Sequence, residues 1–378
     1  MKCPMPVAVA APQARAVAGD VAARVSVVVP CRNEERPVEQ LLEALRLQDW
    51  PIHDVIVVDD GSSDASAEVV EAYSRRYRDF PVRVVRSLQR GIPSAINVGI
   101  RSAEGDVVIR LDAHSYPAPD YVRRALEALY ETDAGVIGGA WDIVPGRPGV
   151  IAQAIAGAVA HPLGAGDAAY RIAGRGTGRR TVDTVPFGCF RKALWEQVGG
   201  FNERLRTNED YEFNYRVRQS GRDVVLDPRI RSTYFARGTL AELARQYFRY
   251  GWWKAEMLKS HPRSLRWRQA VPATFVAGCA TLAAASPFLR PAAWSLVALL
   301  AVYAVALIGA SVHISGGRRS WRILPALPVA FAVIHFSWGG GLLVNLLTAG
   351  RWPRRAAAIA DAPDAQRQRA SNDAGRQG

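Results

Sequence analysis

The sequence predicts an α/β protein in which a doubly wound parallel sheet comes first and apolar helices follow. Two observations predict the sheet: short runs of Val and Ile alternate with helical segments up to residue 130, and polar residues follow several of these runs. A third observation predicts the helices. Charged residues become scarce from 271 to 349, apart from a short basic loop.

The first half of the chain alternates strands and helices regularly. Because parallel strands joined by helices cross over in a right-handed way, this order predicts a doubly wound parallel sheet. The expected strands are Val25–Pro30, Val55–Val58, Val82–Val85 and a run from Val107 that ends at Asp112. The expected helices begin at Pro37, run over Ala65–Arg76, lead from Arg90 through Ile100, and span Tyr121–Tyr130.

Beyond residue 135 the pattern is looser. We expect a further strand at Val136–Trp141, a mobile Gly- and Arg-rich loop over 164–180, an extended segment at Val182–Phe187, and helices at Ala193–Val198 and Tyr211–Gln219. Thr207 or Asn208 would cap the last of these. The expected division is a disordered leader (1–22), the α/β domain (23–235), an amphipathic segment (236–268), a transmembrane region (269–350) and a disordered basic tail (351–378).

Leu240–Lys259 is expected to form an amphipathic helix in which aromatic residues, including Trp252 and Trp253, are interleaved with basic ones. That mixture is typical of helices lying at a membrane interface. Three apolar segments follow, each close to the ~20 residues that cross a bilayer: Val271–Leu289, Ala292–Val312 and Ile323–Leu347.

Charge gives conflicting indications about how these segments cross the membrane. Arg318, Arg319 and Arg322 place the loop before the last segment on the cytoplasmic side, together with the first domain. The basic tail, with Arg354 and Arg355, would then fall on the opposite side. A break at Gly339–Gly341 is an alternative, so the number of spans stays open.

The formal net charge of +13 suits an anionic partner: nucleic acid, a membrane surface or small molecules. No helix-turn-helix, RNP or zinc-finger pattern occurs, so we expect no nucleic-acid partner. The chain also lacks a G-x-G-x-x-G after the first strand and a P-loop motif, which argues against NAD and ATP sites. Four scattered cysteines predict neither disulfides nor zinc.

Polar residues that follow strands one, two and four should meet at one sheet edge, because parallel strands end there together. Asp112 and His114, two residues apart, are candidate ligands for a cation that clamps a diphosphate; the alternative is a capping Asp and an ordinary loop His. Helix capping is likewise the alternative role for Asp59, Asp60 and Asp64. We expect Asp64 to be the cap and Asp60 to be functional.

Five motifs occur together in order: Val-Val-Val-Pro-Cys-Arg-Asn-Glu (27–34), Val-Val-Asp-Asp-Gly-Ser-Ser-Asp (57–64), Asp-Ala-His (112–114), Asn-Glu-Asp-Tyr-Glu (208–212) and Gln-Tyr-Phe-Arg-Tyr (246–250). Together they resemble the family 2 inverting glycosyltransferases with the GT-A fold, a Rossmann-like nucleotide-sugar-binding sheet. Asp-Ala-His with the following Tyr-Pro, and Trp-Trp-Lys after the last motif, look most like the bacterial membrane-attached succinoglycan-biosynthesis type. The resemblance spans Val25 to Lys259.

The resemblance implies a nucleotide-diphosphate sugar donor, expected to be a UDP sugar. It assigns donor binding to Pro30, Arg32, Asn33, Glu34, Asp59, Asp60, Arg90 and Asp112. Asp112 and His114 would correspond to the metal-binding D-x-D, holding Mn²⁺ or Mg²⁺ on the diphosphate. His114 departs from that motif. Imidazole favours Mn²⁺, and His114 contacting the diphosphate directly is an alternative.

For catalysis, the resemblance implies that Asp210 is the general base, that Glu209 positions it, and that Arg249 adds positive charge near the diphosphate. The Pro186–Cys189 segment resembles the acceptor-side loop. The expected acceptor is a polyprenyl-diphosphate-linked glycan of exopolysaccharide or cell-envelope synthesis. The enzyme would be a multi-pass protein of the bacterial inner membrane, in contact with membrane lipids, with its catalytic domain in the cytoplasm.

Two other functions remain open at this point. A polyprenyl-phosphate glycosyltransferase, whose acceptor is the lipid phosphate itself, would need no strong base. A non-catalytic nucleotide-sugar-binding subunit of a membrane assembly would explain the departure at His114, although the intact Glu209-Asp210 pair argues against it.

Overall fold

The computed structural model describes residues 23–88, 91–166, 168–172, 178–318 and 320–348. The expected leader, the tail and Arg90 therefore lie outside the described residues. The strands are β1 (Val25–Cys31), β2 (Asp54–Asp59), β3 (Val82–Arg86), β4 (Val107–Arg110), β5 (Tyr116–Pro117), β6 (Val136–Pro145), β7 (Arg180–Thr181), β8 (Cys189–Arg191) and β9 (Val224–Ala236).

The helices of the α/β part are α1 (Glu35–Arg46), α2 (Ser66–Arg76), α3 (Ile92–Ser102), α4 (Tyr121–Thr132), α5 (Val150–Val159), α6 (Pro162–Ala165), α7 (Ala169–Ile172), α8 (Lys192–Val198) and α9 (Glu209–Gln219). Then come α10 (Leu240–Ser260), the 3-10 turn η1 (Pro262–Ser264), α11 (Trp267–Ala285), α12 (Arg290–Gly317), the 3-10 turn η2 (Trp321–Ile323) and α13 (Ala326–Leu347).

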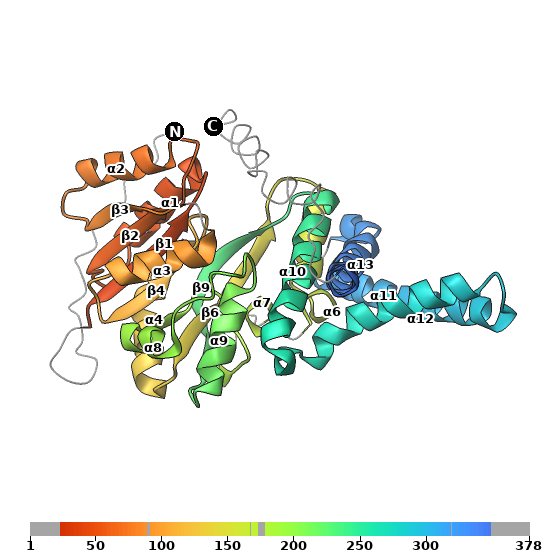
Figure 1. Cartoon of the computed structure of the whole chain (residues 1–378). Coiled ribbons are helices and arrows are strands. Elements are labelled where there is room, and N and C mark those ends of the chain that lie inside the picture. Colours follow the sequence, from red (N-terminus) through yellow and green to blue (C-terminus); the bar gives the residue numbers. More distant parts are fainter. Residues whose placement is uncertain (1–22, 89–90, 167, 173–177, 319, 349–378) are drawn as a thin grey trace, which may run out of the picture.

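One sheet organises the first domain, with the strand order β3-β2-β1-β4-β8-β6-β9-β5 and β7 paired to β9 (Figure 1). The expected parallel arrangement of the first four strands is confirmed. Beyond β4 the sheet is mixed, because β8 runs antiparallel to both β4 and β6. The parallel prediction from the alternation of strands and helices thus holds for β1 to β4, and the antiparallel β8 lies beyond it.

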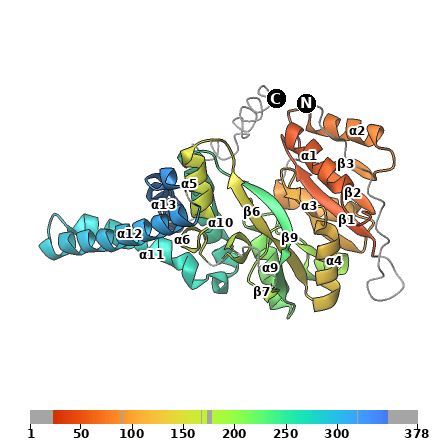
Figure 2. The same cartoon turned by 180° about the vertical axis from the view of Figure 1, so that it is seen from behind.

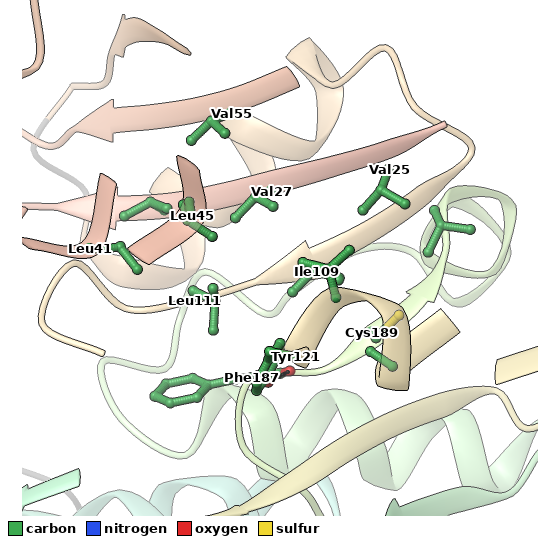
Figure 3. Packing of buried hydrophobic residues seen from close by; sticks show 14 of the residues in the cluster. Val25, Val27, Leu41, Leu45, Val55, Ile109, Leu111, Tyr121, Phe187 and Cys189 are labelled. Carbon is green, nitrogen blue, oxygen red and sulfur yellow. Dashed lines mark hydrogen bonds between the residues drawn. The ribbon is translucent and has the colours of Figure 1, made fainter. Parts of the chain in front are cut away.

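Helices cover both faces of this sheet, so its strands carry apolar residues on both sides. Side chains of β1, β2 and β4 such as Val27, Val55 and Ile109 pack with Leu41 of α1 and Tyr121 of α4 on one face (Figure 3). Residues of α3, α8 and α9 form a second buried cluster on the other face. The fold therefore has three layers, with the loops free to carry polar groups at the strand ends.

Two sequence-based expectations between residues 160 and 190 need correction. Part of the expected mobile loop over 164–180 forms the short helices α6 and α7, while 167 and 173–177 lie outside the described residues. Val182–Phe187 is not a strand; the strands are β7 and β8 on either side of it. Phe187 has a φ of 53°, a left-handed conformation that breaks extended structure immediately before β8.

Helix α10 joins the α/β part to the last helices, and its expected helical span is confirmed. Thr239 caps it and Glu242 completes the capping box. One face of α10 packs inside the protein, where Tyr247 and Trp252 are buried, and its position at a membrane interface stays a prediction. Figures 1 and 2 show α10 beside α13, and the two helices are in contact.

Close approach of α10 and α13 depends on glycine. A Cβ on Gly251 would lie 2.0 Å from the Trp338 carbonyl oxygen, and one on Gly341 would lie 2.1 Å from the Phe248 carbonyl oxygen. The helix is unbroken through these residues. The break expected at Gly339–Gly341 is therefore wrong: at least two of these glycines are packing sites, since Gly339 approaches the Pro272 carbonyl of α11 in the same way.

Two helices among the described residues are long and apolar enough to cross a membrane, α12 and α13. The sequence predicted about three, but α11 begins with Trp267 and Arg268 and does not meet that standard. α11 and α12 contact each other and extend together away from the sheet (Figures 1 and 2). By length and composition, α12 and α13 are therefore candidate membrane spans.

Candidate active site

Arg110, the last residue of β4, lies at the centre of three carboxylates. Its Nη1 donates to Asp210 at 2.6 Å, and its Nη2 donates to Asp112 at 2.7 Å and to Glu209 at 3.3 Å. The Arg110 side chain is only 3% exposed, whereas those of Asp112, Glu209 and Asp210 are 26%, 11% and 21% exposed. The guanidinium is thus enclosed, while the acids retain access to a ligand.

Local structure explains why these residues meet. β4 ends in the middle of the sheet, between β1 and β8, so Asp112 leaves the sheet at its carboxyl edge. Glu209 and Asp210 begin α9, which packs its apolar side on β8 and β9 through Phe213 and Val217. Asn208 stands at the N-cap with a φ of 70°, and its side-chain amide donates to the Tyr250 carbonyl instead of capping the helix.

The electrostatics of the cluster depend on burial. Burial raises the pKa of Asp210 to about 7; Glu209 and Asp112 add to the rise, while Arg110 and the Phe187 backbone N–H oppose it. Burial also raises the pKa of Glu209, against the effects of Arg110 and Arg249. For Arg110, burial lowers the pKa, but the three carboxylates outweigh it and hold that pKa above its ordinary value. Asp210 is therefore a stronger base than an exposed carboxylate.

His114 lies beside the loop that follows β1. Its Nδ1 and Glu34 Oε1 are 2.8 Å apart, and none of the described residues hydrogen-bonds Nε2. A proton on Nδ1 directed at a carboxylate leaves the Nε2 lone pair available to a metal ion. No group of three or more His, Cys, Asp or Glu side chains suited to a metal ion occurs in the described part of the chain. Metal binding by Asp112 and His114 stays a prediction.

The structure brings the loops after β1 and β2 together, as the sequence predicts. Asn33 accepts a hydrogen bond from the Ser63 backbone at 2.7 Å, and Asp59 accepts one from Ser62 at 3.0 Å. Asp64 accepts from the backbone N–H of Ser66 at the start of α2, but Ala65 is the N-cap residue and no side chain caps this helix, so the N-cap lies one residue later than expected. These contacts give Asn33 and Asp59 structural roles.

Among the other predicted donor residues, Asp60 is buried. It accepts hydrogen bonds from the Ser87 hydroxyl and the Gly91 backbone, both at 2.8 Å, so it ties β2 to the start of α3. Pro30 pairs with Val58 inside the sheet, and Arg32 is exposed at the loop tip. A nucleotide contact by Pro30, Arg32 or Asp60 stays a prediction.

Sequence reasoning assigned no role to Arg110, and the structure gives it the central position. A signal was available: one charged residue interrupts the buried run Val-Val-Ile-Arg-Leu immediately before Asp112. Because a charge in a buried strand needs partners, it indicates carboxylates nearby. Which carboxylates pair with it depends on α9, about a hundred residues further along the chain, and no local pattern reveals that.

A three-layer α/β sheet with acidic residues gathered at its carboxyl edge is the arrangement of a GT-A glycosyltransferase. The model of the family "Glycosyl transferase family 2" matches residues 26–195. A mannosyltransferase from Pyrobaculum calidifontis, solved with GDP-Man and Mn²⁺, superposes with a TM-score of 0.56 at 23% identity, over 83% of this chain and 87% of that one. Residues 26–195 therefore match the family 2 glycosyltransferase domain, and the fold is of the GT-A type.

Curated relatives extend this similarity beyond the domain. The succinoglycan biosynthesis protein ExoA of Rhizobium meliloti is 28% identical over 85% of this chain and 94% of its own length. An undecaprenyl-phosphate 4-deoxy-4-formamido-L-arabinose transferase of Pseudomonas aeruginosa is 38% identical, but over only 27% of this chain and 31% of its own. The similarity to the succinoglycan biosynthesis protein thus covers much more of the chain than residues 26–195.

Proposed function

We propose that this protein is a metal-dependent, inverting glycosyltransferase of the membrane. It would move a sugar from a nucleotide-diphosphate sugar, a UDP sugar, to a polyprenyl-diphosphate-linked glycan in exopolysaccharide or cell-envelope glycan synthesis. The observation that carries the proposal is the convergence of Asp112, Glu209 and Asp210 on one buried arginine, at the edge of the sheet where α/β proteins bind ligands.

Asp210 is the proposed general base. Its carboxylate would accept the proton of the acceptor hydroxyl as that oxygen attacks the anomeric carbon from the face opposite the leaving nucleotide, which inverts the configuration. Arg110 holds one Asp210 oxygen by a 2.6 Å hydrogen bond and so fixes the orientation of the carboxylate. The raised pKa brings Asp210 closer to the hydroxyl it must deprotonate.

Three carboxylates against one guanidinium leave an excess of negative charge that favours a divalent cation. Asp112 and Nε2 of His114 would hold Mn²⁺ or Mg²⁺. The bound cation would neutralise the negative charge on the leaving diphosphate. Glu34 would keep the imidazole in the required tautomer. Arg249, whose charge lowers the pKa of Glu209, would add positive charge on the α10 side of the site.

The lipid-linked acceptor is proposed from α12 and α13, which are long and apolar enough to cross a membrane, and from the relative named for succinoglycan biosynthesis. Orientation with the catalytic domain in the cytoplasm follows from the need for nucleotide sugars. A second candidate is transfer to a polyprenyl phosphate itself, favoured by the name of the undecaprenyl-phosphate transferase relative. The carboxylates at the site favour the first candidate, since a phosphate nucleophile needs no base.

One experiment tests the proposal and separates it from a non-catalytic binding subunit. Purified full-length protein in lipid is given UDP sugars, Mn²⁺ and a polyprenyl-diphosphate-linked acceptor, and UDP release is measured. The proposal expects release that depends on metal and acceptor and is lost in Asp210→Asn. Nucleotide-sugar binding without any release would favour the non-catalytic subunit, and unchanged release by Asp210→Asn would favour the phosphate acceptor.

A further inference from the structure

A second cationic group lies beside the catalytic cluster and has no counter-charge. Arg171 of α7 donates through Nη1 to the Tyr247 hydroxyl at 2.9 Å, while its Nε is buried without any acceptor. Among the described residues, no carboxylate pairs with Arg171; its electrostatic neighbours are tyrosines. An arginine enclosed without a carboxylate is ready to receive an anion from outside the chain.

Aromatic side chains surround this arginine: Tyr247 is buried, and the others are partly exposed. The Arg171 guanidinium lies 5.4 Å from the Trp141 ring centre and 5.5 Å from that of Tyr170. Trp141 stacks on Tyr234 at 4.3 Å, and the Gln246 amide holds the hydroxyls of Tyr234 and Tyr250 at 3.1 and 3.0 Å. We call Arg171, Trp141, Tyr170, Tyr234, Tyr247 and Tyr250 the arginine–aromatic enclosure.

The enclosure is adjacent to the catalytic cluster but separate from it. Phe187 lies between the two, with Trp141 at 5.7 Å on one side and the Arg110 guanidinium at 5.5 Å on the other. The loops proposed to bind the donor follow β1, β2 and β4, whereas the enclosure is built from β6, β9, α7 and α10. Figure 1 places α7 near β6, the strand it contacts, on the side toward α10.

On its other side the enclosure borders the apolar helices. Tyr234 and Tyr250 pack against a buried cluster that includes Leu307 of α12 and Phe331 of α13. A ligand with its anionic group at Arg171 would therefore lie next to α12 and α13, the two helices apolar and long enough to share a membrane with an attached hydrocarbon chain. Neither a free nucleotide nor a soluble sugar has that combination.

From this geometry we infer that the arginine–aromatic enclosure binds the phosphate or diphosphate of a lipid-linked acceptor, with Arg171 as the anion-binding residue. The inference rests on the proposed function, because the site it describes is the acceptor site of the proposed glycosyl transfer. Binding the acceptor's phosphate beyond Phe187 would direct the attached glycan, or the phosphate oxygen itself, toward Asp210. Arg171 thus fixes the acceptor class and takes no part in proton transfer.

The test measures binding without donor, using the full chain in detergent micelles and following tryptophan fluorescence. The probes are polyprenyl monophosphate, polyprenol of the same length, inorganic pyrophosphate and UDP. The wild type should bind polyprenyl phosphate at least about tenfold more tightly than polyprenol, and Arg171→Gln should weaken phosphate binding about 10- to 100-fold. Polyprenol and UDP affinities should stay unchanged in that variant, and pyrophosphate should not displace the lipid phosphate.

Matched variants separate charge from folding. Arg75→Gln removes an arginine whose side chain is 70% exposed and should change nothing. Tyr247→Phe keeps Arg171 but removes its hydroxyl partner; if Arg171→Gln does not fold, this variant must still weaken phosphate binding, by less than about tenfold.

Equal binding of lipid phosphate and polyprenol would overturn the inference, as would pyrophosphate binding as tightly as the lipid phosphate. So would an Arg171→Gln or Tyr247→Phe variant that folds and binds the lipid phosphate as the wild type does. Loss of UDP binding in Arg171→Gln to the same degree as loss of lipid phosphate binding would also overturn it. No sugar is transferred in this measurement. A protein that shows the Arg171-dependent binding yet transfers no sugar would therefore contradict the proposed function and leave the anion site standing.

Discussion

Replacing Arg110 by Met should cost the protein both activity and stability. The substitution removes one buried guanidinium and leaves Asp112, Glu209 and Asp210 facing one another without it. Breaking a fully buried ion pair costs about 3–5 kcal/mol. Because the carboxylates here are between about a tenth and a quarter exposed, we expect the free energy of unfolding to fall by roughly 2–4 kcal/mol. Separately, Asp210 loses the donor that orients it, so kcat/KM should fall by about tenfold or more.

The assay is UDP release by full-length protein at saturating Mn²⁺, with thermal unfolding measured on the same preparations. Arg110→Lys keeps the charge but cannot direct two nitrogens at three carboxylates, so it should retain intermediate activity. Arg75→Gln, on the exposed side of α2, is the charge-matched control. An Arg110→Met variant that is folded and within about threefold of wild-type turnover would refute the central position assigned to this residue.

Three further predictions follow from the site and the helix packing. Asp210→Asn should lower kcat by about 10³-fold or more with little effect on donor affinity. Because the base must be ionised and burial raises its pKa to about 7, the wild-type rate should fall as the pH drops below about 7. A rate independent of pH from 5 to 8 would contradict this role of Asp210. His114→Asp should stay active and shift metal preference from Mn²⁺ toward Mg²⁺, measured as turnover against each ion; an unchanged preference would mean that His114 does not bind the metal. Gly341→Ala should destabilise the protein by about 1–3 kcal/mol, because its Cβ would meet the Phe248 carbonyl at 2.1 Å. Gly340→Ala, on the same helix, is the control, since its Cβ would meet nothing within 4 Å. Equal unfolding temperatures of the two variants in detergent would show that the helix crossing is not tight.

The parts of the fold that follow from local pattern were predictable from the sequence. Alternating apolar runs gave β1 to β4 and their helices, and polar residues after each strand predicted that Asn33, Asp59 and Asp112 would lie at one edge. Antiparallel β8 was not predicted, because a three-residue strand such as Cys189–Arg191 carries no periodicity. Long-range pairing alone places it between β4 and β6.

For the candidate site too, the sequence identified individual residues but not their long-range contacts. Motif order identified Asp112, His114, Glu209 and Asp210 as candidates, but no sequence pattern indicated that Arg110 would bridge them. Burial of Trp252 was likewise not predictable, since an aromatic residue on an amphipathic helix suits a membrane surface and a protein core equally well. The presence of α13 against α10 decides between the two.

The central claim is that Asp210, held by Arg110, accepts the proton during transfer of a sugar from a nucleotide donor to a lipid-linked acceptor. Mass spectrometry of the lipid products formed from a panel of nucleotide sugars by purified full-length protein tests it most directly. The account predicts one sugar added to a polyprenyl-diphosphate-linked acceptor, with metal required and the product absent for Asp210→Asn. Lipid products from no donor in the panel, or equal product with Asp210→Asn, would contradict it.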